Sequence, residues 1–91
     1  MITRRLYYEG KVQGVGFRVS VLGLARGYDV LGYVKNLDDG RVEVLLRGEE
    51  NEVDDFLKAI RESHLAGHIE SVQSDVVDAT SIPALRGFQI L

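Results

Sequence analysis

Across residues 6–25 the chain reads LYYEGKVQGVGFRVSVLGLA, and the spacing of its apolar residues changes part-way along. The first part has an apolar residue at every second position, which is typical of a half-buried β-strand: Leu6, Tyr8 and Val12. The second part has them three or four positions apart, which predicts an amphipathic helix over residues 17–26. Gly14 and Gly16 separate the two patterns, so the stretch predicts a strand, a tight turn and a helix.

The remainder of the chain continues this alternation. Val30–Lys35 and a run around Val42–Leu46 predict two strands joined by the hairpin signal Asp39-Gly40. Apolar residues at positions 53, 56, 57 and 60 predict a second helix, and acidic residues at 49, 50 and 52 suit its positive N-terminal end. Ile69–Val77 predicts a weaker strand, Pro83 a loop, and the alternation of Phe88 and Ile90 a short last strand.

The order βαββαβ with amphipathic helices predicts an α+β fold, the ferredoxin-like sandwich, in which two helices cover one face of an antiparallel sheet. A length of 91 residues predicts a single domain over residues 1–91. By area scaling, a chain of this size buries about 64% of its surface, enough for a core without a metal or disulfide. Gly23 costs the first helix about 1 kcal/mol relative to Ala.

Composition excludes several classes of function. The chain has no cysteine, which excludes disulfides, thiolate metal sites and a cysteine nucleophile. Its charge is 11 − 14 = −3, so the domain lacks the basic footprint of a nucleic-acid-binding protein. It has no apolar run of the ~20 residues that a membrane span requires, and its first nine residues do not resemble a secretion signal. We therefore expect a cytoplasmic monomer that binds neither nucleic acid nor membranes.

The turn at residues 10–18, GKVQGVGFR, is the segment most able to carry chemistry. Two glycines at spacing two let the backbone adopt positive φ, and amide groups turned inward beside a helix N-terminus form a nest for anions. Arg18 falls in the first turn of that helix, where its planar fork can hold two phosphate oxygens. The pattern indicates a phosphate or carboxylate cradle, although it also suits a tight turn without a ligand. It is not a Walker A loop or a dinucleotide fingerprint, since the required Lys and third Gly are missing.

Three other polar features are less specific. Asn36 ends the second predicted strand just before a turn, where asparagine is usually a turn former. His64 and His68 stand four apart, as metal ligands on a helix do, but Gly67 and the end of the apolar repeat predict a loop there and no metal site. Tyrosines at positions 7, 8 and 33 could stack on bases across an open sheet, although position 8 shares the inward face with Leu6.

Taken together, two motifs resemble the acylphosphatase family. The first is the run from Gly10 to Arg18, and the second is Gly32-Tyr33-Val34-Lys35-Asn36 followed by Asp39-Gly40-Arg41-Val42-Glu43. They stand at the family's mutual spacing, and the resemblance continues through the second helix to cover most of the chain. It implies a ferredoxin-like enzyme that hydrolyses the carboxyl-phosphate bond of acyl phosphates, releasing a carboxylate and inorganic phosphate.

The resemblance also implies the site. Arg18 and Asn36 would be the catalytic residues, the first binding the phosphate and the second holding the attacking water. The small-molecule acyl phosphate would be bound by the loop residues Gln13, Gly14, Val15, Gly16, Phe17 and Arg18. No cofactor or metal would be required, because phosphoryl transfer from a good leaving group needs mainly positioning and charge stabilisation. The alternative is a non-catalytic module that binds an acyl or carbamoyl phosphate. Val19 and Ser20 stand where the family commonly has aromatic or bulkier residues, so we expect the mouth of the site to differ from that of its relatives.

Overall fold

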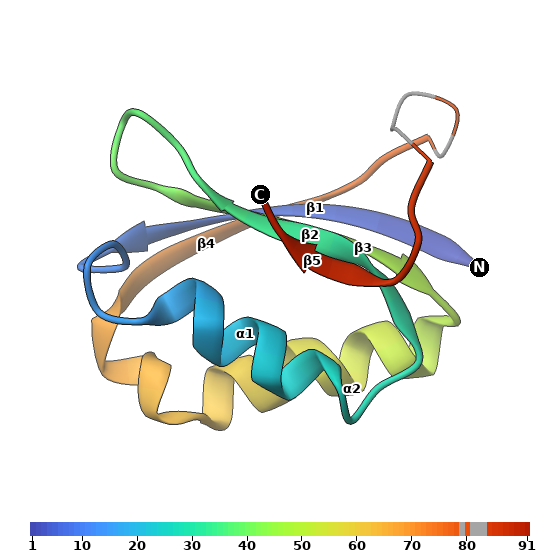
Figure 1. Cartoon of the computed structure of the whole chain (residues 1–91), viewed down its shortest axis with the longest axis horizontal. Coiled ribbons are helices and arrows are strands. Elements are labelled where there is room, and N and C mark those ends of the chain that lie inside the picture. The colour runs from blue at the N-terminus through green and yellow to red at the C-terminus, as the bar shows by residue number, and fades with distance from the viewer. Residues whose placement is uncertain (79, 81–83) are drawn as a thin grey trace.

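The computed structural model describes residues 1–78, 80 and 84–91, and the predicted loop at Pro83 lies outside them. The described residues form a sandwich of one sheet and a layer of helices (Figure 1). Its strands are β1 (Ile2–Gly10), β2 (Val30–Asn36), β3 (Val42–Gly48), β4 (Ile69–Val76) and β5 (Phe88–Ile90). Its helices are α1 (Phe17–Ala25), α2 (Glu50–Glu62) and a short 3-10 helix (His64–His68). All the predicted strands and both predicted α-helices are confirmed, with boundaries that differ by a few residues at most.

The described part of the sheet has the strand order β4-β1-β3-β2-β5. β3 is central and pairs antiparallel with β1 on one side and β2 on the other. The β1–β3 ladder runs from Ile2 opposite Gly48 to Tyr8 opposite Val42. β2 and β3 are joined by the predicted hairpin. β4 pairs antiparallel with the other side of β1. These four strands and the two α-helices make the ferredoxin-like arrangement that the sequence predicts.

The prediction of an antiparallel sheet is wrong at β5, which pairs parallel with β2 through Gly32, Tyr33 and Val34. The ladders explain the direction. β4 runs opposite to β1, and β1 and β2 both run opposite to β3, so β4 also runs opposite to β2. A chain that leaves β4, crosses to the far edge and reverses must therefore run alongside β2 in the same direction. Local alternation at positions 88 and 90 contains no information about that crossing.

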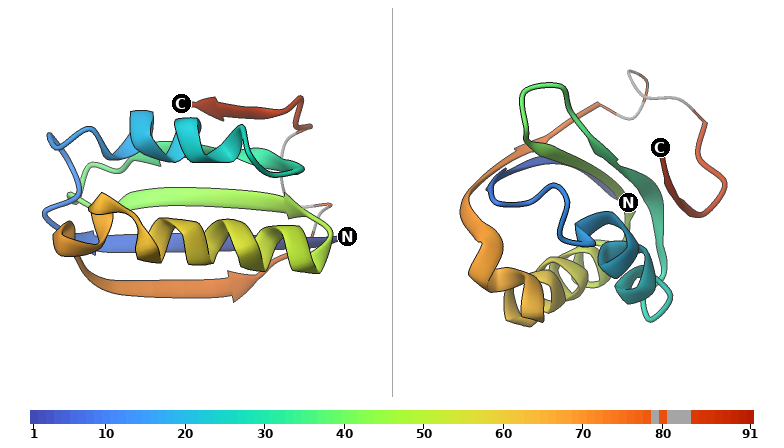
Figure 2. Two further views of the ribbon diagram at one scale, coloured as in Figure 1. Left: turned by 90° about the horizontal axis from the view of Figure 1, so that it is seen from below. Right: turned by 60° about the vertical axis from the view of Figure 1, so that its left-hand side comes forward.

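α1 and α2 lie side by side on one face of the sheet, as Figures 1 and 2 show. α1 contacts β2 and β5, and α2 contacts β3. Between the layers lies the core, whose completely buried members include Val12, Val21, Val34, Val42, Val44, Leu46, Val53, Phe56, Ile60 and Leu65. Aromatic contacts tie the layers together, since Phe56 of α2 meets Phe88 of β5 edge-on at 5.7 Å between ring centroids.

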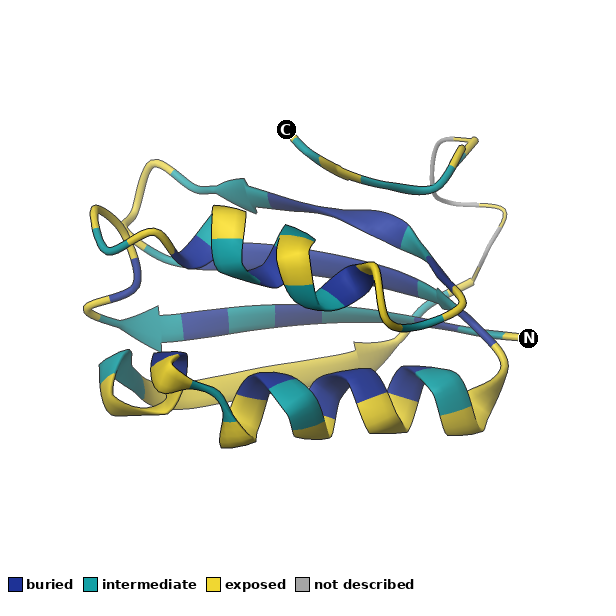
Figure 3. Ribbon diagram, turned by 60° about the horizontal axis from the view of Figure 1, so that its bottom comes forward, coloured by how far each residue is buried: buried dark blue, intermediate teal, exposed yellow. Residues whose placement is uncertain are grey.

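Residues 64–68 form a 3-10 helix and not the predicted irregular loop. Leu65 is fully buried in the core and supplies the apolar contact that holds this turn. Ser63 caps it, because its hydroxyl oxygen accepts a hydrogen bond from the Leu65 amide at 3.1 Å. The turn leads directly into β4, whose residues from Glu70 to Val76 are exposed (Figure 3).

Gly32 is the position where the sheet has least room. Its φ is 155°, and a Cβ atom there would overlap the carbonyl oxygen of Leu45 on β3. We expect Gly32→Ala to lower the free energy of unfolding by about 2 kcal/mol or more, since β2 and β3 would have to separate. Gly23→Ala is the control: nothing lies within 4 Å of a Cβ at position 23 of α1. It should raise stability by about 1 kcal/mol. Urea denaturation of both variants measures the difference, and a neutral Gly32→Ala would contradict the packing described.

Candidate active site

The loop between β1 and α1 is fixed at both ends by buried apolar residues. Val12 is fully buried, and Phe17, the first residue of α1, is 2% exposed. The Phe17 ring packs against Tyr8 of β1 at 5.2 Å between centroids. The four residues between these anchors therefore have little freedom to move, and they form a short, rigid loop over one end of the sheet.

Backbone conformation turns this loop into a row of amide donors. Gly14 and Gly16 have φ of 78° and 76°, the left-handed conformation that the sequence predicts at both positions. Gly16 is the N-cap of α1, and its carbonyl accepts the first helical hydrogen bond from the Ser20 amide at 3.0 Å. The amides of residues 17–19 precede that bond and so have no acceptor within the helix. They form the positive end of the helix dipole, which favours an anion.

Gln13 fastens the loop to the β2–β3 hairpin. Its side-chain nitrogen donates to the carbonyl oxygens of Leu37, at 2.8 Å, and Arg41, at 3.0 Å. Both acceptors belong to the turn that follows Asn36. The side chain of Gln13 is thus occupied by the protein itself, and its effect on the site is to hold the glycine loop and the end of β2 in register.

A cavity of about 190 Å³ lies where the loop, β2 and β5 meet. Its lining includes both sequence-predicted catalytic residues, Arg18 and Asn36, and three of the predicted loop residues, Gly14, Gly16 and Phe17. Gln13 and Val15 do not line it; Val15 instead packs partly buried against the core. The structure thus brings residues of the two sequence motifs to one cavity.

Three further residues line this cavity: Val12, Val19 and Ile90. The sequence places Val19 at the mouth of the site but does not assign Val12 or Ile90 to it. Val19 is 69% exposed, an unusual position for a valine, and it directly follows Arg18. This exposed position agrees with the place at the mouth that the sequence analysis gives to Val19. Ile90 could not be predicted from the sequence, because it reaches the cavity only through the parallel pairing of β5 with β2.

The polar groups in the cavity are free to bind a ligand. Among the described residues, no carboxylate lies within 4 Å of the Arg18 guanidinium, and no hydrogen bond occupies it. The Oδ1 atom of Asn36 is buried and also lacks a hydrogen-bond partner in that part of the chain. An unsatisfied buried acceptor is costly, so its presence indicates a position that a donor from a ligand or water fills.

Lys35 points away from this cavity. On the opposite face of the sheet its ammonium lies 3.9 Å from the carboxylate of Glu43, which also accepts a 2.8 Å hydrogen bond from the Tyr33 hydroxyl and lies 3.6 Å from Arg5. Burial, together with the neighbouring Glu43, raises the pKa of Tyr33 to about 12, so the hydroxyl remains a donor. This cluster holds the end of β2 from the outer face while Asn36 lines the cavity.

The histidines take no part in the cavity. His64 Nε2 lies 3.1 Å from the Ser20 hydroxyl and links the 3-10 helix to α1. The His68 carbonyl accepts the Lys11 amide at 3.0 Å. Within the described ranges, no three side chains of His, Cys, Asp or Glu are close enough to hold a metal ion. None of the helices described there is long and apolar enough to cross a membrane.

Comparison with known proteins identifies this arrangement. The family model described as "Acylphosphatase" matches residues 4–90. The chain belongs to the acylphosphatase family. An acylphosphatase of Acaryochloris marina is 36% identical over 91 residues, covering 100% of this chain and 95% of that protein. Members of the family are enzymes that hydrolyse the carboxyl-phosphate bond of acyl phosphates, as the sequence motifs imply for this chain.

Solved structures give the same result. The crystal structure of acylphosphatase from Bacillus subtilis has a TM-score of 0.87 and 33% identity, and the match covers 100% of this chain and 99% of that one. The crystal structure of HypF from T. kodakarensis has a TM-score of 0.84 and 26% identity, with 100% of this chain matching 12% of that one. The acylphosphatase fold is therefore found both alone and as a small part of a longer protein.

The Gln13 contacts predict a role in positioning the acylphosphatase loop. Gln13→Ala removes two hydrogen bonds between the loop and the hairpin, each worth about 1 kcal/mol. We expect affinity for inorganic phosphate to fall by roughly threefold to tenfold, because the loop amides are no longer held in position by the hairpin. Gln73→Ala on the exposed face of β4 is the matched control and should bind phosphate normally. Isothermal titration of both variants with inorganic phosphate measures the affinities. Unchanged affinity in Gln13→Ala would show that Gln13 does not position the loop.

Proposed function

We propose that the cavity shared by Arg18 and Asn36 is the active site, with Arg18 binding the phosphoryl group and Asn36 holding the attacking water. The proposal treats residues 1–91 as one domain that acts as a cytoplasmic monomer without a cofactor. What supports it best is the buried Oδ1 of Asn36, which has no partner among the described residues and lies in the same cavity as the free Arg18 guanidinium.

The phosphoryl group would occupy the positive end of α1. Its oxygens would accept hydrogen bonds from the amides of residues 17–19 and from the fork of Arg18, whose geometry suits two oxygens at once. These donors are already in place and have no competing acceptor among the described residues. They would therefore stabilise the charge that develops on the phosphoryl oxygens without having to reorganise during the reaction.

Asn36 would orient the nucleophile. A water that donates one hydrogen to Oδ1 keeps a lone pair free, and that lone pair attacks phosphorus while the bond to the acyl oxygen breaks. The products are a carboxylate and inorganic phosphate, and the proton released by the water passes to phosphate or solvent. A carboxylate is a stable leaving group, so its oxygen does not require a general acid. Positioning is the main task of the site.

The mouth of the cavity would contact the acyl group. Val19 and Ile90 place apolar side chains at the lining, and neither offers a polar group that could select one acyl chain by hydrogen bonding. A volume of about 190 Å³ suits a phosphoryl group, a water and the start of an acyl chain, with the rest of that chain extending past Val19. We therefore propose a small-molecule acyl phosphate with an apolar acyl group as substrate.

We also propose that the domain does not bind nucleic acid, and the side chains on the outer face of the sheet support this. Tyr33 is 7% exposed and hydrogen-bonded to Glu43, so its ring is not free to stack on a base. The Tyr7 ring is covered by the Arg41 guanidinium, 4.5 Å from its centroid. Tyr8 is buried on the helix side, at 1% exposure. The open face therefore offers no ready aromatic platform of the kind that binds single strands.

Separate variants distinguish the two catalytic roles. Arg18→Lys should lower kcat/KM for benzoyl phosphate by about 100-fold or more, because a point charge cannot replace a bidentate fork. Asn36→Ala should lower kcat by a similar factor of about 100 yet leave the affinity for inorganic phosphate within about twofold. Steady-state kinetics and phosphate titration provide the measurements.

Matched controls exist on the exposed surface of the helices. Arg26→Lys lies at the far end of α1, and Asn51→Ala lies in the first turn of α2; neither residue lines the cavity. Both controls should keep full activity. Near-native turnover by Arg18→Lys would remove its proposed role, and a loss of phosphate binding in Asn36→Ala as severe as in Arg18→Ala would show that the roles are divided differently.

A further inference from the structure

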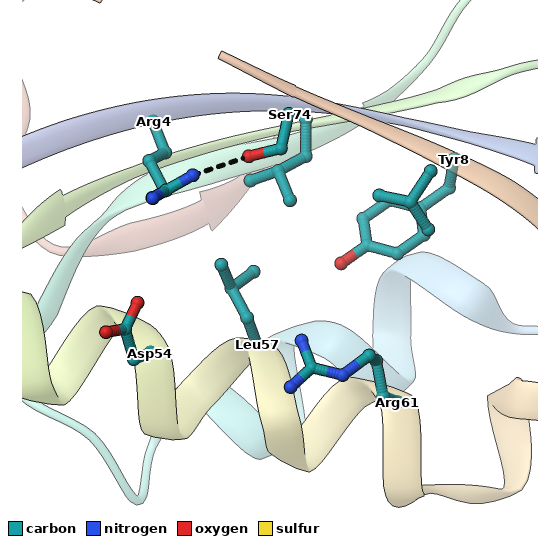
Figure 4. A pocket seen from close by; sticks show the side chains of 8 residues that line it. Arg4, Tyr8, Asp54, Leu57, Arg61 and Ser74 are labelled. Carbon is teal, nitrogen blue, oxygen red and sulfur yellow. Dashed lines mark hydrogen bonds between the residues drawn. The ribbon is translucent and has the colours of Figure 1, made fainter. Parts of the chain in front are cut away.

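A second cavity, of about 380 Å³, lies between α2 and the β1–β4 edge of the sheet (Figure 4). It shares no lining residue with the cavity of Arg18 and Asn36. Strand β1 contributes Arg4, Leu6 and Tyr8, α2 contributes Asp54, Leu57 and Arg61, and β4 contributes Val72 and Ser74. Apart from the Tyr8 ring, which packs on Phe17 and helps to hold the loop, none of these side chains takes part in the proposed hydrolysis.

The cavity exists because the helices do not cover β4. Tyr8 pairs with Val72 and Leu6 pairs with Ser74 across the β1–β4 ladder, so these residues share the helix-facing side of the sheet. On β4 the inward positions carry side chains too small to reach α2, and Val72 remains 40% exposed. Asp54, Leu57 and Arg61 follow one another at helical spacing along the facing side of α2, which leaves a hollow between the two layers.

Arginine and tyrosine side chains with hydrogen-bond donors line this hollow. Arg4 Nη1 donates to the Ser74 hydroxyl at 2.9 Å, but its Nε atom is buried and has no partner among the described residues. Arg61 makes no ion pair within that part of the chain. Figure 4 shows the Tyr8 hydroxyl and the Arg61 guanidinium directed into the same space. Burial raises the pKa of Tyr8, and nearby Arg61 offsets this only in part, so the hydroxyl stays protonated.

The charge of the cavity is opposite to that of the protein. The chain has a net charge of −3, yet the lining contains the cations Arg4 and Arg61 against the single carboxylate of Asp54. Asp54 lies on the side of Arg4 in Figure 4 and forms no ion pair within 4 Å with either arginine. Leu6, Leu57 and Val72 supply apolar walls beside these donors.

We propose that this cavity binds a small organic anion, with its carboxylate or phosphate group between Arg61, Arg4 and the Tyr8 hydroxyl and its apolar body against Leu57 and Val72. Two arginines whose side chains form no ion pair among the described residues match an oxyanion, and the volume lies within the range of small-molecule sites. The apolar walls explain why the ligand would be an organic anion and not a bare inorganic ion. Asp54 limits the site to ligands of low negative charge.

The test is a titration of the full chain in an Arg18→Gln background, which removes the principal cation of the other cavity. Benzoate, phenyl phosphate and inorganic phosphate are added in separate arms, and the methyl signals of Leu57 and Val72 are followed by NMR. We expect saturable shifts with benzoate or phenyl phosphate and at least ~10-fold weaker binding of inorganic phosphate. Arg61→Gln should weaken the binding of the organic anion by about 10-fold, and Asp54→Asn should strengthen its binding.

Lys58→Gln is the matched control, because Lys58 is an exposed cation of α2 that pairs with Glu62 and does not line the cavity. It should leave binding unchanged. With Arg18 intact, Arg61→Gln should also hydrolyse benzoyl phosphate at the normal rate. The proposal is overturned by the absence of saturable shifts, by equal effects of Arg61→Gln and Lys58→Gln, by inorganic phosphate binding as tightly as phenyl phosphate, or by loss of hydrolysis in Arg61→Gln.

Discussion

Burial of Val12 and Phe17 is the constraint on which the candidate active site depends. These two side chains lie in the core on either side of a four-residue loop, so the loop must reverse direction over a very short path. Only left-handed backbone at Gly14 and Gly16 closes it, and that conformation is what exposes the first amides of α1. The apolar core thus creates the anion cradle, because the packing of Phe17 on Tyr8 holds in place amide donors that have no acceptor within the helix.

The opposite wall of the site, at the end of β2, is also held in place by contacts outside the cavity. The side-chain oxygen of Asn36 is buried at the end of β2, where the hairpin turn begins, and has no hydrogen-bond partner among the described residues. Gln13 holds this turn on one side, and the cluster around Glu43 holds the end of β2 on the other. The Tyr33 hydroxyl and the Glu43 carboxylate are hydrogen-bonded to each other on the outer face, whereas Asn36 Oδ1 and the Arg18 guanidinium have no partner among the described residues. Although the domain has a net charge of −3, each of the two cavities is lined by at least one arginine, Arg18 in the first and Arg4 and Arg61 in the second.

Much of this could be predicted from the sequence, because local patterns report local structure. Period-two and helical spacing located the strands and helices, and paired glycines predicted the left-handed turn that Gly14 and Gly16 form. The direction of β5, and hence Ile90 as a wall, depends on a crossing between distant strands that periodicity does not encode. Gln13 was predicted to bind substrate as part of the loop, and its side chain could be placed on the hairpin only once Leu37 and Arg41 had positions. The second cavity likewise depends on how far α2 stands from β4.

We propose that this acylphosphatase-family site acts by positioning and charge, without a general acid or metal. The most direct test compares hydrolysis of benzoyl phosphate and glycerol phosphate by the full chain in the presence of EDTA. Both substrates present the same phosphoryl group to Arg18, but the alkoxide leaving group of glycerol phosphate is far more basic than a carboxylate and requires a proton donor or a metal. We expect rapid hydrolysis of benzoyl phosphate, unaffected by EDTA or by His64→Gln, and hardly any release of phosphate from glycerol phosphate. Comparable turnover of the two substrates, or loss of activity with EDTA, would contradict this mechanism.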